Sequence, residues 1–521
     1  MKRKINNEVF KEFIDQTSNF FKKKEEKCGI VRHIFVDAAF NDHFTVYATM
    51  KISSAVAEIL GGDIIALAPL RGNRRARAII QSFHPKYILN YKFFVLKGFI
   101  KYFFRVMKHT SSIITGDDLV RLKEMNLPIG MHIYDDILRR YNLSTVDRLS
   151  FKQKLFVMLS ISFFYAMYNF ISSQNFFFAI IPDNTYRDGL IFEIIKAKEI
   201  PSISGIDING ISMHKYESNI DYQYHCRTPD NELINTILGK EQVNLLIENY
   251  IELRTKGEEK QHDVMRAYSK NKIMINREIL IREHNLDPNK PLIAVMAHIF
   301  CDAPHGYPQL LFKDYEDWLC ETCEALVKNC NVEFFVKEHP SVSLYNEEGV
   351  IERILGRLGL LNKLLKKNIN TRSLFTVVDA VITCGGTAGM EFPCFGVPVL
   401  LAAKPAYAYF SYVVSPDTKQ GYLNEIKKIH EYKKLSNDEV KKAKAVLFTI
   451  HYLMKFPKRN IGLGTQEYYL GSGFDFEIFM KEMIDDYASG NGYQNLLEVM
   501  EVFLKSRYKN LLDFDKIRNI L

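Results

Sequence analysis

The stretch from residue 380 to residue 402, AVITCGGTAGMEFPCFGVPVLLA, restricts the fold of this chain more than any other. Its first four residues are apolar or β-branched, which is typical of a buried strand in a parallel sheet. Gly385 and Gly386 follow almost at once, and glycine lets the backbone turn sharply and come close to a ligand. A buried strand that ends in a glycine turn predicts an α/β fold with a ligand at the end of this strand.

A helix is predicted directly after the glycine turn. Thr387 is placed to cap a helix over 388–395, Gly396 is placed to end it, and the apolar run 397–401 is the next strand. The N–H groups of a first helical turn have no partner inside the helix, so they can donate to an anion. The stretch therefore predicts a phosphate-binding loop that needs no metal.

A second strand end with polar side chains lies one βα unit upstream. The run 334–341 reads FFVKEHPS, an apolar strand that leads into Lys337, His339 and Pro340. Proline forces the preceding residue into an extended conformation, which brings the imidazole to the carboxyl end of the strand. Ligands bind at that edge of an open parallel sheet, so the two strand ends together predict an anion site. The alternative is that the glycines only allow tight packing and that the histidine is structural.

The rest of the chain predicts two α/β domains followed by helices. Apolar runs alternate with helical spacing on both sides of a charged stretch at 240–288, which marks the domain boundary. We predict an α/β protein with two Rossmann-like domains that face a cleft, at 1–285 and 286–425, and a helical C-terminal extension at 426–521. The main predicted strands are 30–36, 63–67, 176–182, 201–206, 292–300, 334–341, 380–383 and 397–401.

The composition indicates an ordinary globular protein. Of the 521 residues 47% are hydrophobic and 25% are charged, and the net charge is only +8. This charge suits small anionic ligands or an acidic membrane surface, and no basic stripe interleaved with aromatic residues indicates nucleic acid. The cysteines are scattered and follow no secretory signal, which indicates a reducing, cytoplasmic setting. Cys320, Cys323 and Cys330 lack the second ligand pair of a zinc site.

Residues 155–171 form an apolar run at the short limit for a membrane span. The run leads through 172–175 directly into the predicted strand at 176–182. A helix followed at once by a strand fits an α/β domain, so a buried helix is predicted and a membrane span is the alternative.

The two strand-end motifs resemble the C-terminal half of the bacterial capsule polysaccharide biosynthesis glycosyltransferases, a family that includes transferases of Kdo from CMP-Kdo. In that family a Lys-x-His-Pro strand end precedes a Ser/Thr–Gly–Glu loop and helix, a Gly-x-Pro-Val strand and an aromatic segment. The resemblance covers about residues 290–420. The matching positions are Lys337, His339, Pro340, Thr387, Gly389, Glu391, Gly396, Pro398, Val399 and Tyr407.

The chain departs from this family at two points. Glu338 stands where the family often has proline, and no glycine–tryptophan pair follows Tyr407. These differences leave the donor sugar open. The His-Pro pair with a following Ser/Thr motif also resembles bacterial sialyltransferases, which use CMP donors as well.

The resemblance implies a GT-B-type, nucleotide-sugar-dependent glycosyltransferase of capsular or lipopolysaccharide synthesis. The first domain would hold a glycan or lipid-linked glycan acceptor and the second the nucleotide sugar, for which a CMP-activated acidic sugar such as Kdo is favoured. No cofactor and no metal is expected. The expected location is the cytoplasm, with possible peripheral association at the inner face of the cytoplasmic membrane. The alternatives are a polymer polyol-phosphate transferase with a CDP-polyol donor and a non-catalytic carbohydrate-assembly scaffold.

Such a transfer requires stabilisation of the leaving phosphate and an acidic group near the acceptor or the anomeric carbon. The first task is assigned to nucleotide-binding residues that follow the two strands. Glu391 would hold the ribose or orient the loop. The assigned residues are Lys337, His339, Pro340, Gly385, Gly386 and Thr387, and His339 is also assigned a catalytic role.

The acidic group is expected from the first domain. Asp188, after the strand at 176–182, is the first choice, and Asp37 and Asp42, after the strand at 30–36, come next; the alternative for each is a helix cap. Asp302 and His305 follow the first strand of the second domain and are expected at the same cleft. The doublets Asp117–Asp118 and Asp135–Asp136 are interpreted as solvated or capping carboxylates, because acidic pairs near helix starts are common.

Overall fold

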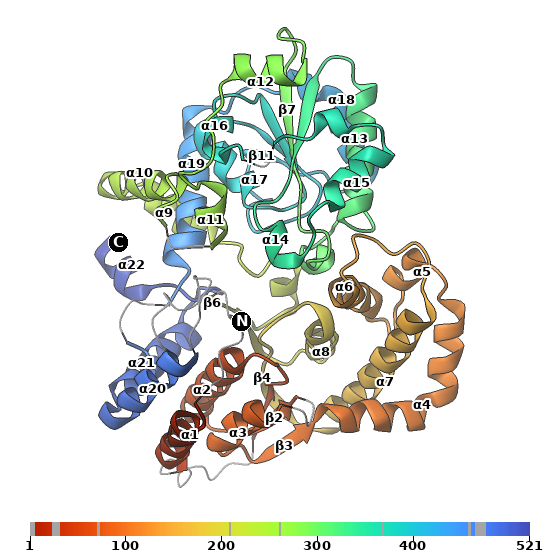
Figure 1. The fold of residues 1–521 in the computed structure, drawn as a ribbon. Helices are drawn as coiled ribbons and strands as arrows, with labels where there is room; N and C mark the ends of the chain where they lie inside the picture. Colours follow the sequence, from red (N-terminus) through yellow and green to blue (C-terminus); the bar gives the residue numbers. More distant parts are fainter. Residues whose placement is uncertain are drawn as a thin grey trace.

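The computed structural model describes residues 6–22, 32–69, 73–207, 210–259, 262–366, 368–456, 460–463 and 476–520. Within these ranges the chain forms two separate β-sheets, both covered by helices (Figure 1). The predicted class, an α/β protein with two Rossmann-like domains, is confirmed. The eight predicted strands all occur, although the start of the one predicted at 30–36 lies outside the described residues.

The first sheet has six strands in the order β3-β2-β1-β4-β5-β6. All neighbours are parallel except β5 and β6. The strand order reverses between β1 and β4, and the carboxyl ends of the strands at such a reversal form a crevice. The strands are β1 His33–Asp37, β2 Asp63–Ala68, β3 Tyr87–Asn90, β4 Phe176–Ile180, β5 Ser202–Asp207 and β6 Gly210–Tyr216.

Alternation along β1 divides the core of the first domain into two layers. Ile34 and Val36 face the layer that contains α1 and α2, whereas Phe35 faces the layer that contains α6, α7 and α8. The helices are α1 Asn7–Lys22, α2 His43–Leu60, α3 Arg74–Ser82, α4 Tyr91–Ser112, α5 Gly116–Val120, α6 Ile129–Tyr141, α7 Phe151–Ser173 and α8 Tyr186–Ala197.

Helix α7 contains the apolar run at 155–171. Among the described residues it is the one helix long and apolar enough to cross a membrane, with a mean hydropathy of 1.6 in its most apolar window. In this fold 56% of that window is buried, and α7 packs against α4, α6 and α8. The structure therefore uses it as a core helix of the first domain, as the sequence predicted.

The second sheet has the order β11-β10-β9-β7-β8, and every neighbouring pair is parallel. Its strand order reverses between β7 and β9. The strands are β7 Leu292–Met296, β8 Glu333–Lys337, β9 Ala380–Thr383, β10 Val399–Leu401 and β11 Val413–Val414. The helices around it are α12 Arg277–His284, η3 Pro304–Gly306, α13 Tyr315–Lys328, α14 Val342–Tyr345, α15 Val350–Arg357, η4 Leu361–Lys363, α16 Thr371–Leu374, α17 Ala388–Glu391, η5 Phe392–Phe395, α18 Lys419–Lys428 and η6 Ile429–Glu431.

The helices before β7 belong to the second domain, which differs from the predicted division at residue 285. Leu233 of α9, Ile247 of α10 and Leu280 of α12 are buried in the same core as β7 and β9. The chain therefore leaves the first domain soon after β6, through η2 Asn219–Gln223. The other helices of this segment are α9 Asn231–Leu238, α10 Glu241–Thr255 and α11 His262–Ala267.

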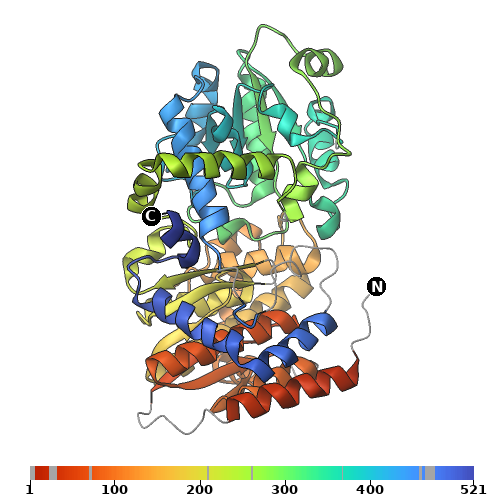
Figure 2. The ribbon, with the colours of Figure 1, turned by 90° about the vertical axis from the view of Figure 1, so that its left-hand side faces the viewer.

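The segment predicted as one C-terminal extension is divided between the two domains. Helix α19, Asn437–Phe448, contributes to the second core, and η7 Thr449–Leu453 leads back towards the first domain. Helices α20 Phe476–Ser489 and α21 Asn491–Lys505 lie against α1 and α2, and Figure 2 shows these blue helices beside the red ones. The chain ends with α22 Phe514–Ile520. The apolar faces of α20 and α21 thus close the core of the first domain.

A substitution at Phe479 tests this packing of α20 against the first domain. Its ring is fully buried and lies 5.4 Å from that of Phe44 and 5.2 Å from that of Tyr47, both on α2. We expect Phe479→Ala to lower the free energy of unfolding of the first domain by about 3–5 kcal/mol, because it leaves a large cavity. Urea denaturation measures this loss. The neighbouring Ile478 is 46% exposed, so Ile478→Ala should change stability by no more than about 0.5 kcal/mol, and equal losses in the two variants would contradict the assignment.

Candidate functional site

A pocket of about 70 Å³ lies at the carboxyl ends of β7, β8 and β9, where the strand order of the second sheet reverses. Six residues predicted from the two motifs line it together, and Gly385 precedes one of them directly. The sequence placed these residues at two strand ends, and the tertiary structure brings both ends to one pocket. The six are Lys337, His339, Pro340, Gly386, Thr387 and Glu391.

The loop after β9 supplies backbone donors to this pocket. The N–H groups of Gly386, Thr387 and Ala388 have no hydrogen-bond partner among the described residues, whereas Gly389 N–H already donates to the Gly386 carbonyl at 2.9 Å. Thr387 does not cap the helix as predicted, because its own backbone is already helical and its side chain makes no capping bond. Three free N–H groups beside a lysine and a histidine can hold an anion.

The predicted helix at 388–395 occurs in two parts. Helix α17 covers its first turn, and the 3₁₀ helix η5 covers the remainder from Phe392. Gly396 ends it with φ at 82°, a left-handed conformation that favours glycine. Pro393 has no N–H to donate, which explains why a regular α-helix does not continue.

The glycines of the loop make room for two tyrosines. A Cβ atom on Gly385 would lie 2.9 Å from the Tyr307 ring, and one on Gly389 would lie 2.2 Å from the Tyr407 hydroxyl. That hydroxyl donates to the Gly386 carbonyl at 2.6 Å. The glycines therefore allow tight packing of the loop, and the same loop leaves the three N–H groups without a partner among the described residues.

Lys337 is almost completely buried beside the loop. Its Nζ donates to the Ile369 carbonyl at 3.2 Å. Burial, followed by the charge of Lys272, lowers the pKa of Lys337 to about 7, and Glu338 opposes this change. An anion in the pocket would favour the charged ammonium, so the lysine can couple ligand binding to proton uptake.

Two histidines present different hydrogen-bonding atoms to the pocket. His339 Nδ1 accepts from the Ser341 N–H at 3.2 Å, so the neutral ring carries its proton on Nε2 as a donor. His298 Nε2 accepts from the Cys384 N–H at 3.2 Å and holds the loop after β9. Burial, reinforced by His339, lowers the pKa of His298 to about 3, so it stays neutral. His298 is not among the residues predicted from the sequence, although it follows β7 directly, as His339 follows β8.

Glu391 is held by two buried partners. Arg254 Nε lies 2.9 Å from Oε1 and the Tyr268 hydroxyl lies 2.5 Å from Oε2. Burial raises the pKa of Glu391, and Arg254 opposes this rise by favouring the carboxylate. Because both oxygens are engaged, the observed contacts orient the loop, and a bond to ribose stays a prediction.

His305 and Asp135 form a buried pair across the boundary between the domains. His305 Nδ1 lies 2.7 Å from Asp135 Oδ1, and the His305 N–H donates to Oδ2 at 3.1 Å. His305 Nε2 is buried with no partner among the described residues. The interpretation of Asp135 as a solvated or capping carboxylate is therefore wrong, because the helical period turns it inward from α6 to the second domain. Asp118 does cap α5, through a capping box with Thr115.

Asp302 lies beside this pair and is held by two tyrosines. The Tyr186 hydroxyl donates to Oδ1 at 2.9 Å, and the Tyr345 hydroxyl donates to Oδ2 at 3.1 Å. Tyr186 belongs to the first domain and Tyr345 to the second, so Asp302 also connects the domains. Asp302 and His305, which the sequence analysis expected at a cleft, both contact residues of the first domain.

Asp188 and Asp37 lie in the first domain and share one guanidinium. Arg187 Nε donates to Asp188 Oδ1 at 2.6 Å, and its Nη2 lies 3.0 Å from Asp37 Oδ2. Burial raises the pKa of Asp188, and Arg187 opposes this rise. Neither carboxylate is among the residues that line the pocket of the second domain. A role for Asp188 in catalysis stays a prediction.

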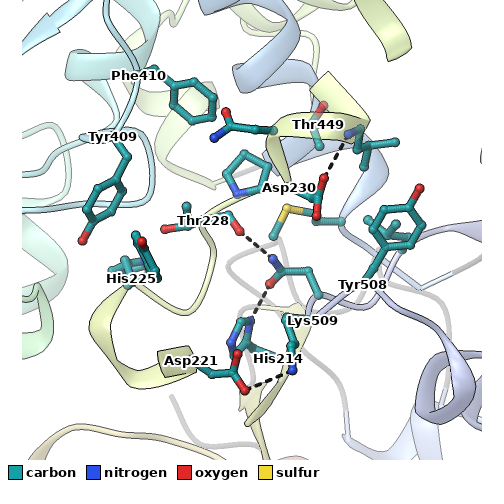
Figure 3. Close-up of a pocket in the computed structure, with 17 residues that line it drawn as sticks. His214, Asp221, His225, Thr228, Asp230, Tyr409, Phe410, Thr449, Tyr508 and Lys509 are labelled. Carbon is teal, nitrogen blue, oxygen red and sulfur yellow. Dashed lines mark hydrogen bonds and ion pairs between the residues drawn. The ribbon is translucent and has the colours of Figure 1, made fainter. Parts of the chain in front are cut away.

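A larger cavity of about 300 Å³ lies where the chain crosses between the domains (Figure 3). Segments after β6, after β10 and near the C-terminus form its walls. Asn510 joins two of them, because its side chain bonds His214 Nδ1 at 3.0 Å and the Thr228 carbonyl at 2.8 Å. None of the sequence-predicted site residues lines this cavity. The larger cavity and the predicted site residues are therefore in different places. We assign the functional site by its chemistry.

The described residues contain no group of three or more His, Cys, Asp or Glu side chains placed to hold a metal ion. Cys320 and Cys323 lie on α13, and Cys323 is buried in the core of the second domain. Cys330 is exposed after the end of that helix.

No protein-family profile and no curated protein matches the chain. Several solved structures match it at low identity. A beta Kdo 2,4 transferase, KpsC of Thermosulfurimonas dismutans, matches over 60% of this chain and 88% of its own, at 15% identity and a TM-score of 0.34. The beta Kdo 2,7 transferase of the same KpsC matches over 60% and 85%, at 14% identity and a TM-score of 0.29. A glycosyltransferase from Rickettsia africae matches over 88% and 98%, at 10% identity and a TM-score of 0.25. These are distant structural resemblances, and with TM-scores this low the architecture rests on the two sheets alone.

The buried Lys337 gives a pH-dependent stability. Its pKa is about 7 in the folded protein and near 10.5 in the unfolded chain. Between these values the unfolded chain binds more protons, so the destabilisation caused by burying the ammonium is complete below pH 7 and fades as the pH rises. We expect ligand-free Lys337→Met to be more stable than the wild type by on the order of 4 kcal/mol at pH 6, with a smaller difference at higher pH.

Urea denaturation at a series of pH values measures this difference. The exposed Lys328→Met serves as the control and should show little change at any pH. A stability difference for Lys337→Met that stays constant from pH 6 to pH 9 would contradict the lowered pKa.

Proposed function

We propose that the chain is a nucleotide-sugar-dependent glycosyltransferase of surface polysaccharide synthesis. The donor would be a CMP-activated acidic sugar such as Kdo, and the acceptor a glycan or a lipid-linked glycan. The observation that carries this proposal is the pocket at the ends of β8 and β9, where Lys337, His339 and free N–H groups converge. These groups suit the phosphate of a nucleotide sugar at the edge of a sheet where ligands bind.

The donor side of the reaction follows from this pocket. The bond between the anomeric carbon and the phosphate oxygen breaks, and its electron pair leaves with the phosphate. Lys337 balances the negative charge, and His339 Nε2–H together with the N–H groups of Thr387 and Ala388 donates to the phosphate oxygens. Glu391 acts through Arg254 and Tyr268 by keeping the loop in place. A preorganised set of donors lowers the barrier because it needs no rearrangement as charge develops.

The acceptor side would use the pair of His305 and Asp135. The acceptor oxygen bonds to the anomeric carbon, and its proton passes to His305 Nε2, which has no partner among the described residues. Asp135 fixes the ring with the proton on Nδ1 and stabilises the imidazolium that forms. Because Nε2 is shielded from solvent, acceptor entry requires a relative displacement of the domains. Asp188 is the second candidate for this step and would first have to be released by Arg187.

Binding of nucleotides to the purified protein tests the proposal. A ligand that binds only the native state raises its apparent stability, so we would compare thermal shifts with CMP, CDP, UMP, UDP and GDP, with and without magnesium. We expect a shift with CMP that does not need magnesium and that is lost in Lys337→Met, while Lys328→Met keeps it. A shift with UDP or GDP alone would contradict the donor class, and no shift at all would favour a scaffold.

Acceptor-dependent release of CMP then separates the remaining alternatives. A glycosyltransferase releases CMP and adds no phosphorus to the product. A polyol-phosphate transferase releases CMP and adds phosphorus, and a scaffold releases none.

The proton acceptor is tested by kinetics. We expect His305→Gln to lower kcat by about a hundredfold, with thermal shifts by CMP retained. Asp135→Asn should lower kcat because the ring loses its orientation. His430→Gln is the control, because His430 is a half-buried histidine of the second domain that lines neither cavity. Loss of turnover in Asp188→Asn with normal turnover in His305→Gln would instead identify Asp188 as the acidic group.

A further inference from the structure

Helix α4 has an apolar face that no other described element covers. Phe93, Leu96 and Ile100 follow each other at three- and four-residue steps, so they lie on one side of the helix before its bend at Tyr102, and Phe104 is exposed just after the bend. Ile100 is 69% exposed and Phe104 is 86% exposed. Large side chains are rarely exposed in such a group, which indicates that something covers this face in the cell.

Basic side chains border this apolar face. This basic row consists of Lys97 and Lys101 before the bend at Tyr102 and of Arg105 and Lys108 after it, and Lys92 stands near the start of the helix. The helix Tyr91–Ser112 contains no acidic residue. The only carboxylate that contacts this row within the described residues is that of Glu124, which is buried and lies 3.6 Å from Arg105 and 2.7 Å from His109.

The opposite side of α4 is firmly packed, so the outer face has a fixed shape. A Cβ on Gly98 would lie 1.8 Å from the Ser162 carbonyl of α7, which shows how closely the two helices cross. The rings of Phe94 and Phe170 lie 5.3 Å apart and those of Tyr102 and Tyr165 lie 5.1 Å apart. A bend at Tyr102 divides α4 into two segments, which run along the outside of α7 (Figure 1).

The first turns of α7 also present exposed apolar residues with basic neighbours. Phe151, Leu155 and Leu159 are exposed and spaced by four residues, and Phe151 is 83% exposed. Lys152 and Lys154 lie among them. Two helices that pack against each other thus both present exposed apolar residues with basic neighbours.

We propose that the outer face of α4, with the first turns of α7, docks on the surface of an anionic lipid bilayer. An apolar row that enters the boundary between headgroups and acyl chains, bordered by cations that meet anionic headgroups, is the arrangement of an interfacial helix. The face suits a second copy of this chain poorly, because a symmetric contact would bring the basic rows of two α4 helices together. This inference stands apart from the proposed activity, since it would hold for any reaction in the second domain.

Sedimentation with lipid vesicles tests the proposal. We expect the full chain to bind vesicles of phosphatidylcholine and phosphatidylglycerol, and to bind vesicles of phosphatidylcholine alone much more weakly. High salt should weaken binding to the anionic vesicles. Ile100→Ser with Phe104→Ser should reduce binding by about tenfold or more, because the apolar contact is lost. Lys97→Gln with Lys101→Gln should reduce it by about fivefold for each charge removed.

Matched controls separate this surface from general adhesion. Leu245, on α10, is as exposed as Ile100 at 69%, and Lys433 and Lys434 are exposed on the second domain. Leu245→Ser, and Lys433→Gln with Lys434→Gln, should bind anionic vesicles like the wild type. All substituted residues lie on the surface, so unchanged circular dichroism and melting temperature are expected in every variant.

Three results would overturn the proposal. The first is that the wild type does not sediment with anionic vesicles. The second is that the α4 variants bind as well as the controls do. The third is a concentration-dependent dimer that Ile100→Ser with Phe104→Ser abolishes while vesicle binding persists, which would assign the face to a second copy of the chain.

Discussion

A parallel sheet must bury both of its faces, and the arrangement of this chain follows from that requirement. Along β1, Ile34 and Phe35 enter different cores, so helices are needed on each side of the first sheet. One side is completed only by α20 and α21, which arrive after the chain has built the whole second domain. The edges at the carboxyl ends of the strands remain for polar chemistry, and both the pocket and the polar pairs between the domains lie there.

The loop after β9 depends on the buried charge of Glu391, which Arg254 balances at the pocket. Glu391 would be unstable alone in the core, and Arg254 from the helices before β7 makes its burial possible. Burial lowers the pKa of Lys337, and within the described part of the chain no carboxylate bonds its Nζ. In the proposed site the Glu391 carboxylate already has its partners, whereas the Lys337 ammonium would gain from an incoming anion.

The boundary between the domains combines polar and apolar contacts, because Ile299 and Cys301 of the second domain are buried in the core around α6, α7 and α8. Asp135 with His305 and Asp302 with Tyr186 are hydrogen-bonded contacts across it. Polar contacts separate more readily than apolar ones, because water can replace the bonds. The domains are thus joined by directional contacts close to the proposed reaction and by an apolar contact at Ile299 and Cys301. The outer face of α4 belongs to the first domain, so a membrane contact there would leave the second domain able to move.

The sequence by itself determined the class of fold, the principal parallel strands and the two strand ends that form the pocket, because these depend on local patterns of apolar residues, glycine and proline. It missed β3, β6 and β11, which are sheet edges or very short. Only the tertiary structure decided that Asp135 is buried against His305, that Arg187 occupies Asp188 and Asp37, and that α20 joins α1. Helical periodicity shows which residues share a face, but the partner of that face comes from a distant part of the chain. The features that the sequence determined therefore depend on local contacts, and those that only the tertiary structure decided depend on long-range contacts.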